Sequence, residues 1–293
     1  MKLSELIGNT PLVDLQYIPT KKSVKIYGKL EGNNPGGSVK DRAAYGMITG
    51  ALQRGTIKRG DRLVEATSGN TGIALAMIAG MMGLKMTLIM PDNSTRERVL
   101  SMEAYGAKVI LTPAQRTIEY SRQLAEEMAA NEGYFMLDQF ANPDNFGMHY
   151  KTTGPEIWQD TKGTITHFVS AMGTTGTIMG VSMYLKEKNA SIQIIGTQPS
   201  DNSCIPGIRR WSPEFLPRIY DAKRVDRIID IQESDARLCT KRLAGEEGIL
   251  AGMSSGGALM AALQIAEEID EGVVVFIVCD RGDRYLSSDL FSS

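Results

Sequence analysis

The sequence has little cysteine and little histidine. Its three cysteines, Cys204, Cys239 and Cys279, are odd in number, far apart and outside any CxxC pair. This pattern argues against a disulfide framework and against a zinc site. The two histidines, His149 and His167, form no HExxH pair, and the chain contains no GxSxG turn. Metal-assisted and serine–histidine hydrolysis are therefore poorly supported. We expect both histidines to pack, no metal to bind, and any catalytic group to be another residue type.

An excess of either charge and a long apolar run are also absent from the sequence. The 32 basic and 34 acidic residues give a net charge of -2, and they are spread along the chain, which indicates neither a nucleic-acid face nor a membrane-surface face. No apolar run approaches the ~20 residues of a membrane span. The first residues lack the apolar core of ~7 or more residues that a signal peptide requires. We expect a cytoplasmic protein that binds neither nucleic acid nor membrane.

Short apolar runs alternate with helical stretches along the whole chain. This alternation is typical of parallel sheets covered by helices, so the predicted fold class is α/β. The expected strands are residues 25–30, 63–66, 86–90, 109–111, 168–170, 192–197 and 273–278. Helices are expected to begin near Val39, Thr71, Thr95, Thr117, Thr177, Ser234 and Gly256.

The chain is long enough for two layered domains. It has 293 residues, of which 42% are hydrophobic and 23% charged. Asn, Pro and Asp cluster around residues 139–150, and we interpret this stretch as a crossing between two sheets.

One lysine occupies an unusual position at the start of a predicted helix. Lys40 follows a flexible loop, NNPGG at residues 33–37, and Ser38 is a suitable N-cap. The helix N-terminus carries partial positive charge, so a buried amine there loses its proton more easily than a free lysine does. A neutral amine can form a Schiff base and later act as a base. Because a lone lysine is more often a solvated surface residue, its companions decide its role.

Three turns rich in Gly, Ser and Thr each follow a predicted strand and precede a predicted helix. They are residues 67–72 (TSGNTG), 173–177 (GTTGT) and 252–257 (GMSSGG). Unpaired N–H groups of a first helical turn, next to residues without a β-carbon, allow an anion to approach closely. The first turn suits a carboxylate, the second suits a phosphate, and the third offers hydroxyls.

Each turn alone is weak support for a ligand site, because strand-to-helix turns use these residues for purely conformational reasons. None is a P-loop or a GxGxxG dinucleotide turn. Ligands of open α/β sheets gather at the carboxyl ends of the strands, so the three turns and Lys40 can converge on one crevice. A phosphate cradle, a carboxylate site and a Schiff-base lysine together predict a pyridoxal phosphate enzyme.

The sequence resembles the O-acetylserine sulfhydrylase (cysteine synthase) family of fold-type II pyridoxal phosphate enzymes from about residue 7 to residue 286. The motifs that carry the resemblance are IGNTPL at 7–12, KLE at 29–31, GSVKDR at 37–42, TSGNTG at 67–72 and GTTGT at 173–177. Two further segments, IPGIRRW at 205–211 and CDRGDRY at 279–285, are similar to the B type of this family.

The resemblance implies an architecture and an assembly. It implies two twisted, mostly parallel sheets flanked by helices, with the active site in the cleft between two domains. The smaller, mobile domain is expected to span residues 35–145, and the larger domain residues 1–34 and 146–293. A homodimer is expected because the family is homodimeric.

The resemblance also implies roles for the site residues. Lys40 would hold the cofactor as a Schiff base, Asn70 would hydrogen-bond its phenolic oxygen, and Ser254 would face its pyridine nitrogen. A neutral hydroxyl there does not enforce protonation of the ring, which favours prompt β-elimination. The phosphate would be held by Gly173, Thr174, Thr175, Gly176 and Thr177. The substrate carboxylate would be bound by Thr67, Ser68, Gly69 and Thr71, with Gln139 on the other side.

The reaction that the resemblance implies is a β-replacement in cysteine biosynthesis. O-acetylserine would bind, the freed amine of Lys40 would remove the Cα proton as acetate leaves, and sulfide would add at Cβ, so that ping-pong kinetics are expected. Arg209, Arg210, Cys279 and Asp280 would make the pocket polar enough to accept thiosulfate, which gives S-sulfocysteine. The alternative is that the two arginines form ordinary surface ion pairs.

Three other functions stay open at this point. A different fold-type II enzyme, such as a serine or threonine dehydratase or a cystathionine β-synthase, would share the lysine and phosphate motifs. A non-catalytic module that holds a phosphate ligand would keep residues 173–177 but would have no need of Lys40 or Asn70. Binding of a serine acetyltransferase tail is a role of the sister isozyme, and we expect no strong binding of such a tail here.

Overall fold

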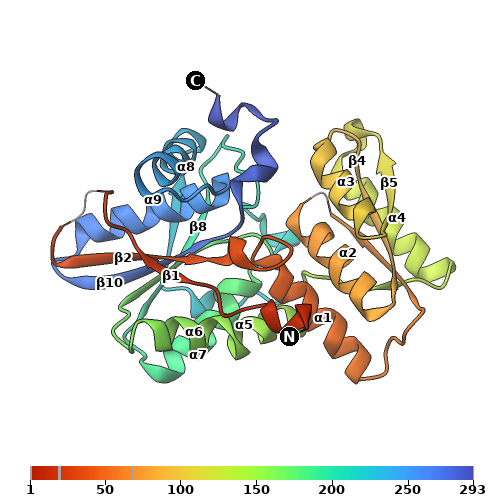
Figure 1. Ribbon diagram of the computed structural model, residues 1–293, viewed down its shortest axis with the longest axis horizontal. Helices are drawn as coiled ribbons and strands as arrows, with labels where there is room; N and C mark the ends of the chain where they lie inside the picture. The colour runs from red at the N-terminus through yellow and green to blue at the C-terminus, as the bar shows by residue number, and fades with distance from the viewer. Residues whose placement is uncertain (1, 19–20, 68, 293) are drawn as a thin grey trace. The chain divides into compact units, whose positions relative to one another are not determined.

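The computed structural model (Figure 1) describes residues 2–18, 21–67 and 69–292. The chain forms two compact units, a larger unit of residues 1–39 and 146–293 and a smaller unit of residues 40–145. The smaller domain was predicted to begin at residue 35, whereas the smaller unit begins at Lys40. Each unit contains one sheet with helices packed on it.

The larger unit is built on a six-stranded sheet with the order β1-β2-β10-β7-β8-β9. Its strands are β1 (Leu12–Asp14), β2 (Val24–Leu30), β7 (His167–Ala171), β8 (Gln193–Pro199), β9 (Arg227–Ile231) and β10 (Gly272–Val278). β1 runs antiparallel to β2, and the other neighbouring pairs are parallel. β8 and β10 are buried over most of their length, as is typical of parallel strands that are covered on both faces.

Helices cover both faces of this sheet. α8 (Glu233–Glu247) and α9 (Met253–Glu268) pack on one face, and α6 (Thr153–Asp160) and α7 (Gly176–Lys188) pack on the other (Figure 1). α5 (Pro143–Lys151) precedes α6. The short 3-10 helices of this unit are η1 (Leu3–Leu6), η2 (Glu31–Asn33), η4 (Pro213–Phe215), η5 (Ala222–Arg224), η6 (Gly282–Tyr285) and η7 (Asp289–Phe291).

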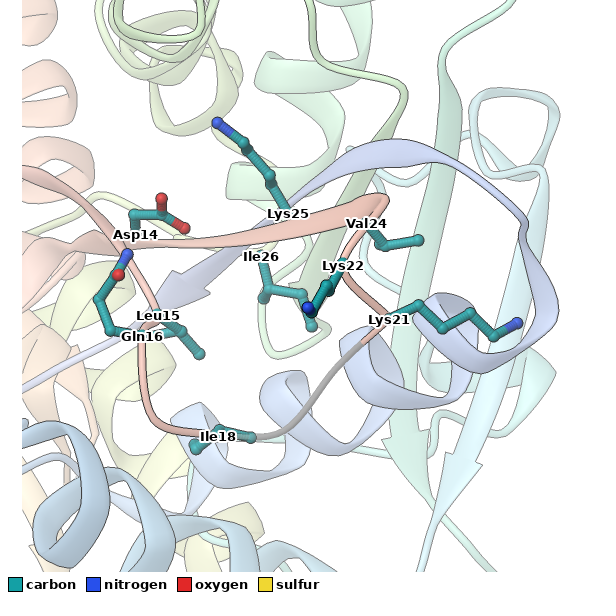
Figure 2. A pocket seen from close by; sticks show the side chains of 9 residues that line it. All are labelled: Asp14, Leu15, Gln16, Ile18, Lys21, Lys22, Val24, Lys25 and Ile26. Carbon is teal, nitrogen blue, oxygen red and sulfur yellow. The ribbon is translucent and has the colours of Figure 1, made fainter.

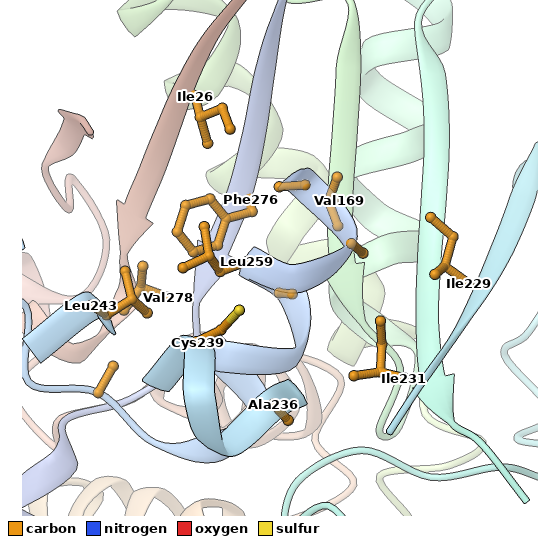
Figure 3. Packing of buried hydrophobic residues seen from close by; sticks show 14 of the residues in the cluster. Ile26, Val169, Ile229, Ile231, Ala236, Cys239, Leu243, Leu259, Phe276 and Val278 are labelled. Carbon is orange, nitrogen blue, oxygen red and sulfur yellow. The ribbon is translucent and has the colours of Figure 1, made fainter. Parts of the chain in front are cut away.

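The main core of the larger unit lies between the sheet and the pair α8 and α9. Figure 3 shows Ile26 of β2, Val169 of β7 and Phe276 of β10 on the same side of the sheet as Leu259 of α9. All four side chains are almost completely buried, and burial of such a side chain stabilises a fold by about 1.5–3 kcal/mol. Cys239 of α8 belongs to the same cluster, and burial raises the pKa of its thiol to about 11, so this cysteine is unreactive.

The smaller unit is built on a four-stranded parallel sheet with the order β5-β4-β3-β6. Its strands are β3 (Arg62–Ala66), β4 (Lys85–Pro91), β5 (Lys108–Thr112) and β6 (Phe135–Met136). Its helices are α1 (Lys40–Gln53), α2 (Asn70–Met82), α3 (Arg96–Ala104) and α4 (Thr117–Asn131), with a short η3 (Ala114–Arg116). Ala125 and Met128 of α4 pack against Val64 of β3 and Ile89 of β4.

The predicted fold class is confirmed, and the differences are local. All seven expected strands are present, with ends shifted by a residue or two. Strands β1, β6 and β9 were not expected, because β1 and β6 have only three and two residues and β9 exposes three of its five residues. The expected start of α9 at Gly256 was wrong, since the helix begins at Met253 and includes the Ser-Ser-Gly-Gly run.

Three further properties bear on function. None of the helices in the described residues has the length and apolar character needed to cross a membrane. In the same part of the chain, no three His, Cys, Asp or Glu side chains gather in a way that could hold a metal ion. Within the described ranges, Cys204, Cys239 and Cys279 form no disulfide bond.

Candidate active site

The turn at residues 173–177 links the end of a parallel strand to the start of a helix. β7 ends at Ala171 and α7 begins at Gly176, so the first N–H groups of α7 are available at the carboxyl edge of the sheet. Thr175 is the N-cap residue and has a φ of 69°, in the left-handed region. This conformation is rare for a β-branched residue and is found where a site requires it.

Two observations show that this turn fits a phosphate. The Thr175 hydroxyl is buried and has no hydrogen-bond partner in the described part of the chain, although buried hydroxyls are normally paired. A β-carbon at Gly173 would lie 2.8 Å from the carbonyl oxygen of Gly207, so only glycine fits there. The turn therefore offers an unused hydroxyl donor beside a helix N-terminus, the donor set that a phosphate requires.

A histidine outside the predicted site contacts this turn. Nε2 of His149 lies 3.3 Å from the hydroxyl oxygen of Thr177, and its Nδ1 lies 2.8 Å from the hydroxyl oxygen of Thr153. His149 is 1% exposed, which agrees with the packing role expected for it. It also holds the Thr177 side chain, a role that nothing in the local sequence indicates because the two residues belong to different helices.

The segment at residues 205–211 packs on the phosphate turn and on Ser254. The indole N–H of Trp211 donates a hydrogen bond of 2.9 Å to the carbonyl oxygen of Gly173. Gly207 has a φ of 89°, and a β-carbon there would lie 3.2 Å from the β-carbon of Ser254. Ser254 is buried in the first turn of α9. The structure thus brings together three predicted parts of the site that are distant in sequence.

The two arginines of this segment differ in their surroundings. Arg210 forms an exposed ion pair with Asp230, lies 3.5 Å from Asp201 and donates a hydrogen bond to the carbonyl oxygen of Pro199. Arg209 is exposed and lies over the Trp211 ring at 5.9 Å. Among the residues described, no carboxylate forms an ion pair with Arg209.

Cys279 and Asp280 lie at the end of β10, beside the start of α9. The backbone N–H of Cys279 donates to the Ser255 hydroxyl at 2.9 Å. Asp280 is 1% exposed and accepts hydrogen bonds from the Tyr285 hydroxyl at 2.7 Å and from the Gly252 N–H at 3.2 Å. A carboxylate at a helix N-terminus is stabilising, so Asp280 has a clear structural function at the start of α9.

The predicted carboxylate site lies in the smaller unit, where β3 leads into α2. β3 ends at Ala66, Gly69 is the N-cap residue, and α2 begins with Asn70. The hydroxyl of Thr71 donates to Oε1 of Gln139 at 2.9 Å. This contact joins two predicted carboxylate ligands that are far apart in sequence. Thr67 is buried after β3, and Ser68 lies outside the described residues.

Lys40 is the first residue of α1 and is half-buried. The residue before it, Val39, donates its backbone N–H to the carbonyl oxygen of Cys279 at 2.8 Å. Lys40 is thus the first residue of the smaller unit, directly after a residue that is hydrogen-bonded within the larger unit. Its place at the start of a helix was predicted from the sequence.

Glu65 was not singled out from the sequence. It lies in β3 and is 4% exposed, and its Oε2 has no hydrogen-bond partner in the described residues. Burial raises the pKa of its carboxyl group to about 8, and the nearby carboxylate of Asp138 contributes in the same direction. The signal that would have found it is an acid inside the apolar strand Leu63–Ala66, since a buried charge without a partner is costly.

Comparison with known proteins decides the family. The family model described as "Pyridoxal-phosphate dependent enzyme" matches residues 3–280. Cysteine synthase B of Pseudomonas aeruginosa is 58% identical over 99% of this chain and 97% of that protein. Cysteine synthase B of Escherichia coli is 56% identical over 99% of this chain and 95% of that protein. The chain belongs to the cysteine synthase family of pyridoxal-phosphate dependent enzymes.

Solved structures of the family have the same fold. The crystal structure of O-ureido-L-serine synthase matches with a TM-score of 0.94 and 38% identity, over 99% of this chain and 95% of that one. A cysteine synthase from Entamoeba histolytica matches with a TM-score of 0.93 and 38% identity, over 100% of this chain and 90% of that one. The expected fold, the B-type similarity and the pyridoxal phosphate cofactor are confirmed.

A pocket in the larger unit lies apart from these cysteine synthase motifs. It is lined by Asp14, Leu15, Gln16, Ile18, Lys21, Lys22, Val24, Lys25 and Ile26 (Figure 2). The ammonium groups of Lys21 and Lys25 point in different directions in Figure 2 and do not converge on one centre. None of the predicted site residues lines this pocket, and it does not contribute to the site.

The unpaired Thr175 hydroxyl leads to a prediction about cofactor retention. Thr175→Ala removes a donor to the phosphate, so the dissociation constant of pyridoxal phosphate should rise about tenfold. Titration of cofactor-free protein, followed by absorbance, measures this constant. Thr175→Ser, which keeps the hydroxyl, is the matched control and should stay close to the unmodified protein. Pyridoxal, which lacks the phosphate, should bind all three proteins equally; a tenfold loss with pyridoxal too would contradict the assignment.

The raised pKa of Glu65 leads to a prediction about stability and pH. An acid whose pKa is about 8 in the folded protein and about 4.5 in the unfolded chain holds its proton more tightly when folded, so it stabilises the fold at low pH. That stabilisation is lost as pH rises from about 5 to about 8. The free energy of unfolding of the unmodified protein should therefore fall by about 3–5 kcal/mol relative to that of Glu65→Gln across this window. Denaturant unfolding of both proteins at several pH values measures this change. A constant difference would contradict the raised pKa.

Proposed function

We propose that this protein makes L-cysteine by replacing the acetoxy group of O-acetyl-L-serine with sulfide, releasing acetate. The observation that carries the proposal is the 58% identity over nearly the whole chain to a cysteine synthase B. The fit of residues 173–177 to a phosphate supports it independently, through the unpaired Thr175 hydroxyl and the close approach at Gly173.

The cofactor and the protein divide the chemistry between them. Bound pyridoxal phosphate supplies an electron sink that stabilises negative charge at Cα of the substrate. Residues 173–177 would hold its phosphate, Ser254 would face its pyridine nitrogen, Asn70 would bind its phenolic oxygen, and the amine of Lys40 would bind its aldehyde carbon. Released from the cofactor, the same amine would take the proton from Cα as acetate leaves and return it after sulfide adds at Cβ.

The substrate carboxylate is assigned to the turn between β3 and α2. The first N–H groups of α2 favour an anion, and the contact between Thr71 and Gln139 holds two polar side chains at this turn. We propose that Thr67, Ser68, Gly69, Thr71 and Gln139 bind the carboxylate. Closure of a mobile smaller domain would then exclude water from the reacting centre.

Thiosulfate is proposed as a second sulfur donor. After acetate has left, its sulfur would form the bond to Cβ and the Lys40 amine would return the proton to Cα, which gives S-sulfocysteine. Arg209 is the cation best suited to its anionic oxygens, because Arg210 is paired with Asp230 and Asp201 whereas Arg209 has no such carboxylate partner in the described residues. Arg210, Cys279 and Asp280 would contribute to the polarity of the pocket. We also propose a homodimer, as the family resemblance implies, and a cytoplasmic location, as expected from the sequence.

Replacement of Lys40 tests the central assignment. Lys40→Ala should lose the visible absorbance of the lysine-bound cofactor and reduce cysteine formation at least about 10³-fold, because Schiff-base formation and proton transfer are both removed. Lys58→Ala changes an exposed lysine of the same unit and should keep both signals. The products of the unmodified protein should be cysteine and acetate; pyruvate and ammonia would instead indicate a dehydratase. Full turnover by Lys40→Ala would disprove the assignment.

Replacement of Arg209 tests the choice of sulfur donor. Arg209→Ala should reduce kcat/KM for thiosulfate by about tenfold or more, since a charge-assisted hydrogen bond contributes about 1.5–3 kcal/mol. The value for sulfide should change much less. Arg210→Ala is the matched comparison, and it should affect the two donors alike because its partners are carboxylates of the protein. Equal losses with both donors in Arg209→Ala would exclude a specific role for this arginine.

A further inference from the structure

Glu65 is one of the buried ionisable groups that the proposed reaction does not use. It lies in β3, which is central in its sheet between β4 and β6, and it is in register with Leu88 of β4. Two residues after it, Thr67 begins the predicted carboxylate turn. A carboxyl group that is 4% exposed in a parallel sheet is costly to bury, and apolar residues occupy the same strand at Leu63 and Val64.

The groups that face Glu65 come from two segments of the smaller unit. β3 and β6 are in register up to the pair of Val64 and Met136, so the turn after β6 lies beside Glu65. The N–H groups of Asp138 and Gln139 in this turn favour the ionised form of its carboxyl group, and the carboxylate of Asp138 disfavours it. From α4, the positive charge of Arg122 acts on it more weakly, and Arg122 also pairs with Glu126 at 3.3 Å. The residues of β6, Phe135 and Met136, carry no charge.

The turn that Glu65 meets is held in a defined conformation. Asp138 has a φ of 51°, in the left-handed region, and its carbonyl oxygen accepts from the N–H groups of Ala141 and Asn142 at 3.0 and 2.9 Å. The side chain of Asn145 donates to the carbonyl oxygen of Gln139 at 2.8 Å. Glu65 thus lies beside a peptide segment whose carbonyl groups are bound by other residues.

This segment determines how Gln139 is presented. Gln139 is 4% exposed, and its Oε1 accepts the hydroxyl hydrogen of Thr71 at 2.9 Å. Because its oxygen accepts from Thr71, the amide is oriented with its two N–H donors on the side away from Thr71. Donors of this kind are what a carboxylate ligand requires. The path from Glu65 to the carboxylate site thus runs through the backbone at 138–139, the Gln139 side chain and Thr71.

We propose that Glu65 is a positioning residue for the amino-acid carboxylate. Its buried carboxyl group anchors the turn at Asp138 and Gln139, and that turn holds the Gln139 amide against Thr71. The proposal rests on the assignment of the carboxylate site in the proposed function, and it adds a residue that does not itself touch the substrate.

The protonation state of Glu65 gives the proposal a measurable consequence. Burial and the carboxylate of Asp138 raise the pKa of Glu65 to about 8, so the group is neutral at pH 7 and becomes charged in mildly alkaline solution. Ionisation places a second negative charge beside Asp138 and close to a site that binds an anion. Repulsion between this charge and Asp138 opposes the conformation of the turn, and the same charge disfavours an anionic ligand nearby, so binding of an amino acid should weaken as pH rises through this range.

Binding of L-alanine by the holoenzyme tests the proposal. L-alanine has no leaving group on Cβ, so its binding is followed by the change in cofactor absorbance without turnover. Between pH 7 and pH 9 the dissociation constant for the unmodified protein should rise about tenfold more than for Glu65→Gln, whose amide cannot ionise. Titration of the ligand amine and of the cofactor affects both proteins alike and cancels in the ratio. The same pH dependence in both proteins would overturn the proposal.

A second variant keeps the test decisive if Glu65→Gln does not fold. Asp138→Asn removes the neighbouring charge that raises the pKa of Glu65, so the alkaline weakening should move to lower pH; an unmoved midpoint would count against the proposal. In infrared difference spectra, the band of a protonated carboxyl group should disappear as pH rises. In each of the two proteins, the midpoint of this loss should equal the midpoint at which L-alanine binding weakens. If L-alanine binds as expected but no cysteine is formed, the proposed function fails while the role of Glu65 stands.

Discussion

The structure depends on one constraint, the placement of unpaired helix N–H groups at the ends of parallel strands. β7 ends just before the turn that opens α7, and β3 ends just before the turn that opens α2. In each case a turn of small residues leaves the first N–H groups of the helix available to an anion. A pyridoxal phosphate enzyme of amino acids must bind two anionic groups, and we propose the turn of the larger unit for the phosphate and the turn of the smaller unit for the carboxylate.

Local signals in the sequence were sufficient for these turns. The change from a strand pattern to a helix pattern around 173–177 and 67–72, together with their Gly, Ser and Thr content, predicted both sites and placed Lys40 at a helix start. The sequence pattern failed where a decisive contact is distant. The start of α9 was predicted too late, because Ser254 to Gly257 has the composition of a turn, while Asp280 and the hydroxyl of Tyr285 support the first turn as a helix.

Several site residues could not be assigned from sequence for the same reason. His149 contacts Thr177 from another helix, and Trp211 reaches Gly173 across a loop. Arg209 and Arg210 are adjacent and chemically identical. Their neighbours distinguish them, since Asp230 and Asp201 lie beside Arg210 and the Trp211 ring lies beside Arg209. Each distinction depends on which segments fold next to each other, and neither periodicity nor composition records that.

Two buried ionisable residues differ in their surroundings, and the difference separates a structural role from a functional one. Lys29 is fully buried, but its ammonium lies 3.0 Å from carboxylate oxygens of both Glu156 and Asp160 and donates to the carbonyl oxygen of Thr10, so its charge is compensated and its contribution is structural. Glu65 is buried beside a like charge, with one oxygen unpaired in the described residues. Selection for stability alone would favour an apolar residue at this position. The turn beside Glu65 leads to Gln139 and Thr71, so the proposed carboxylate site would explain this uncompensated carboxyl group.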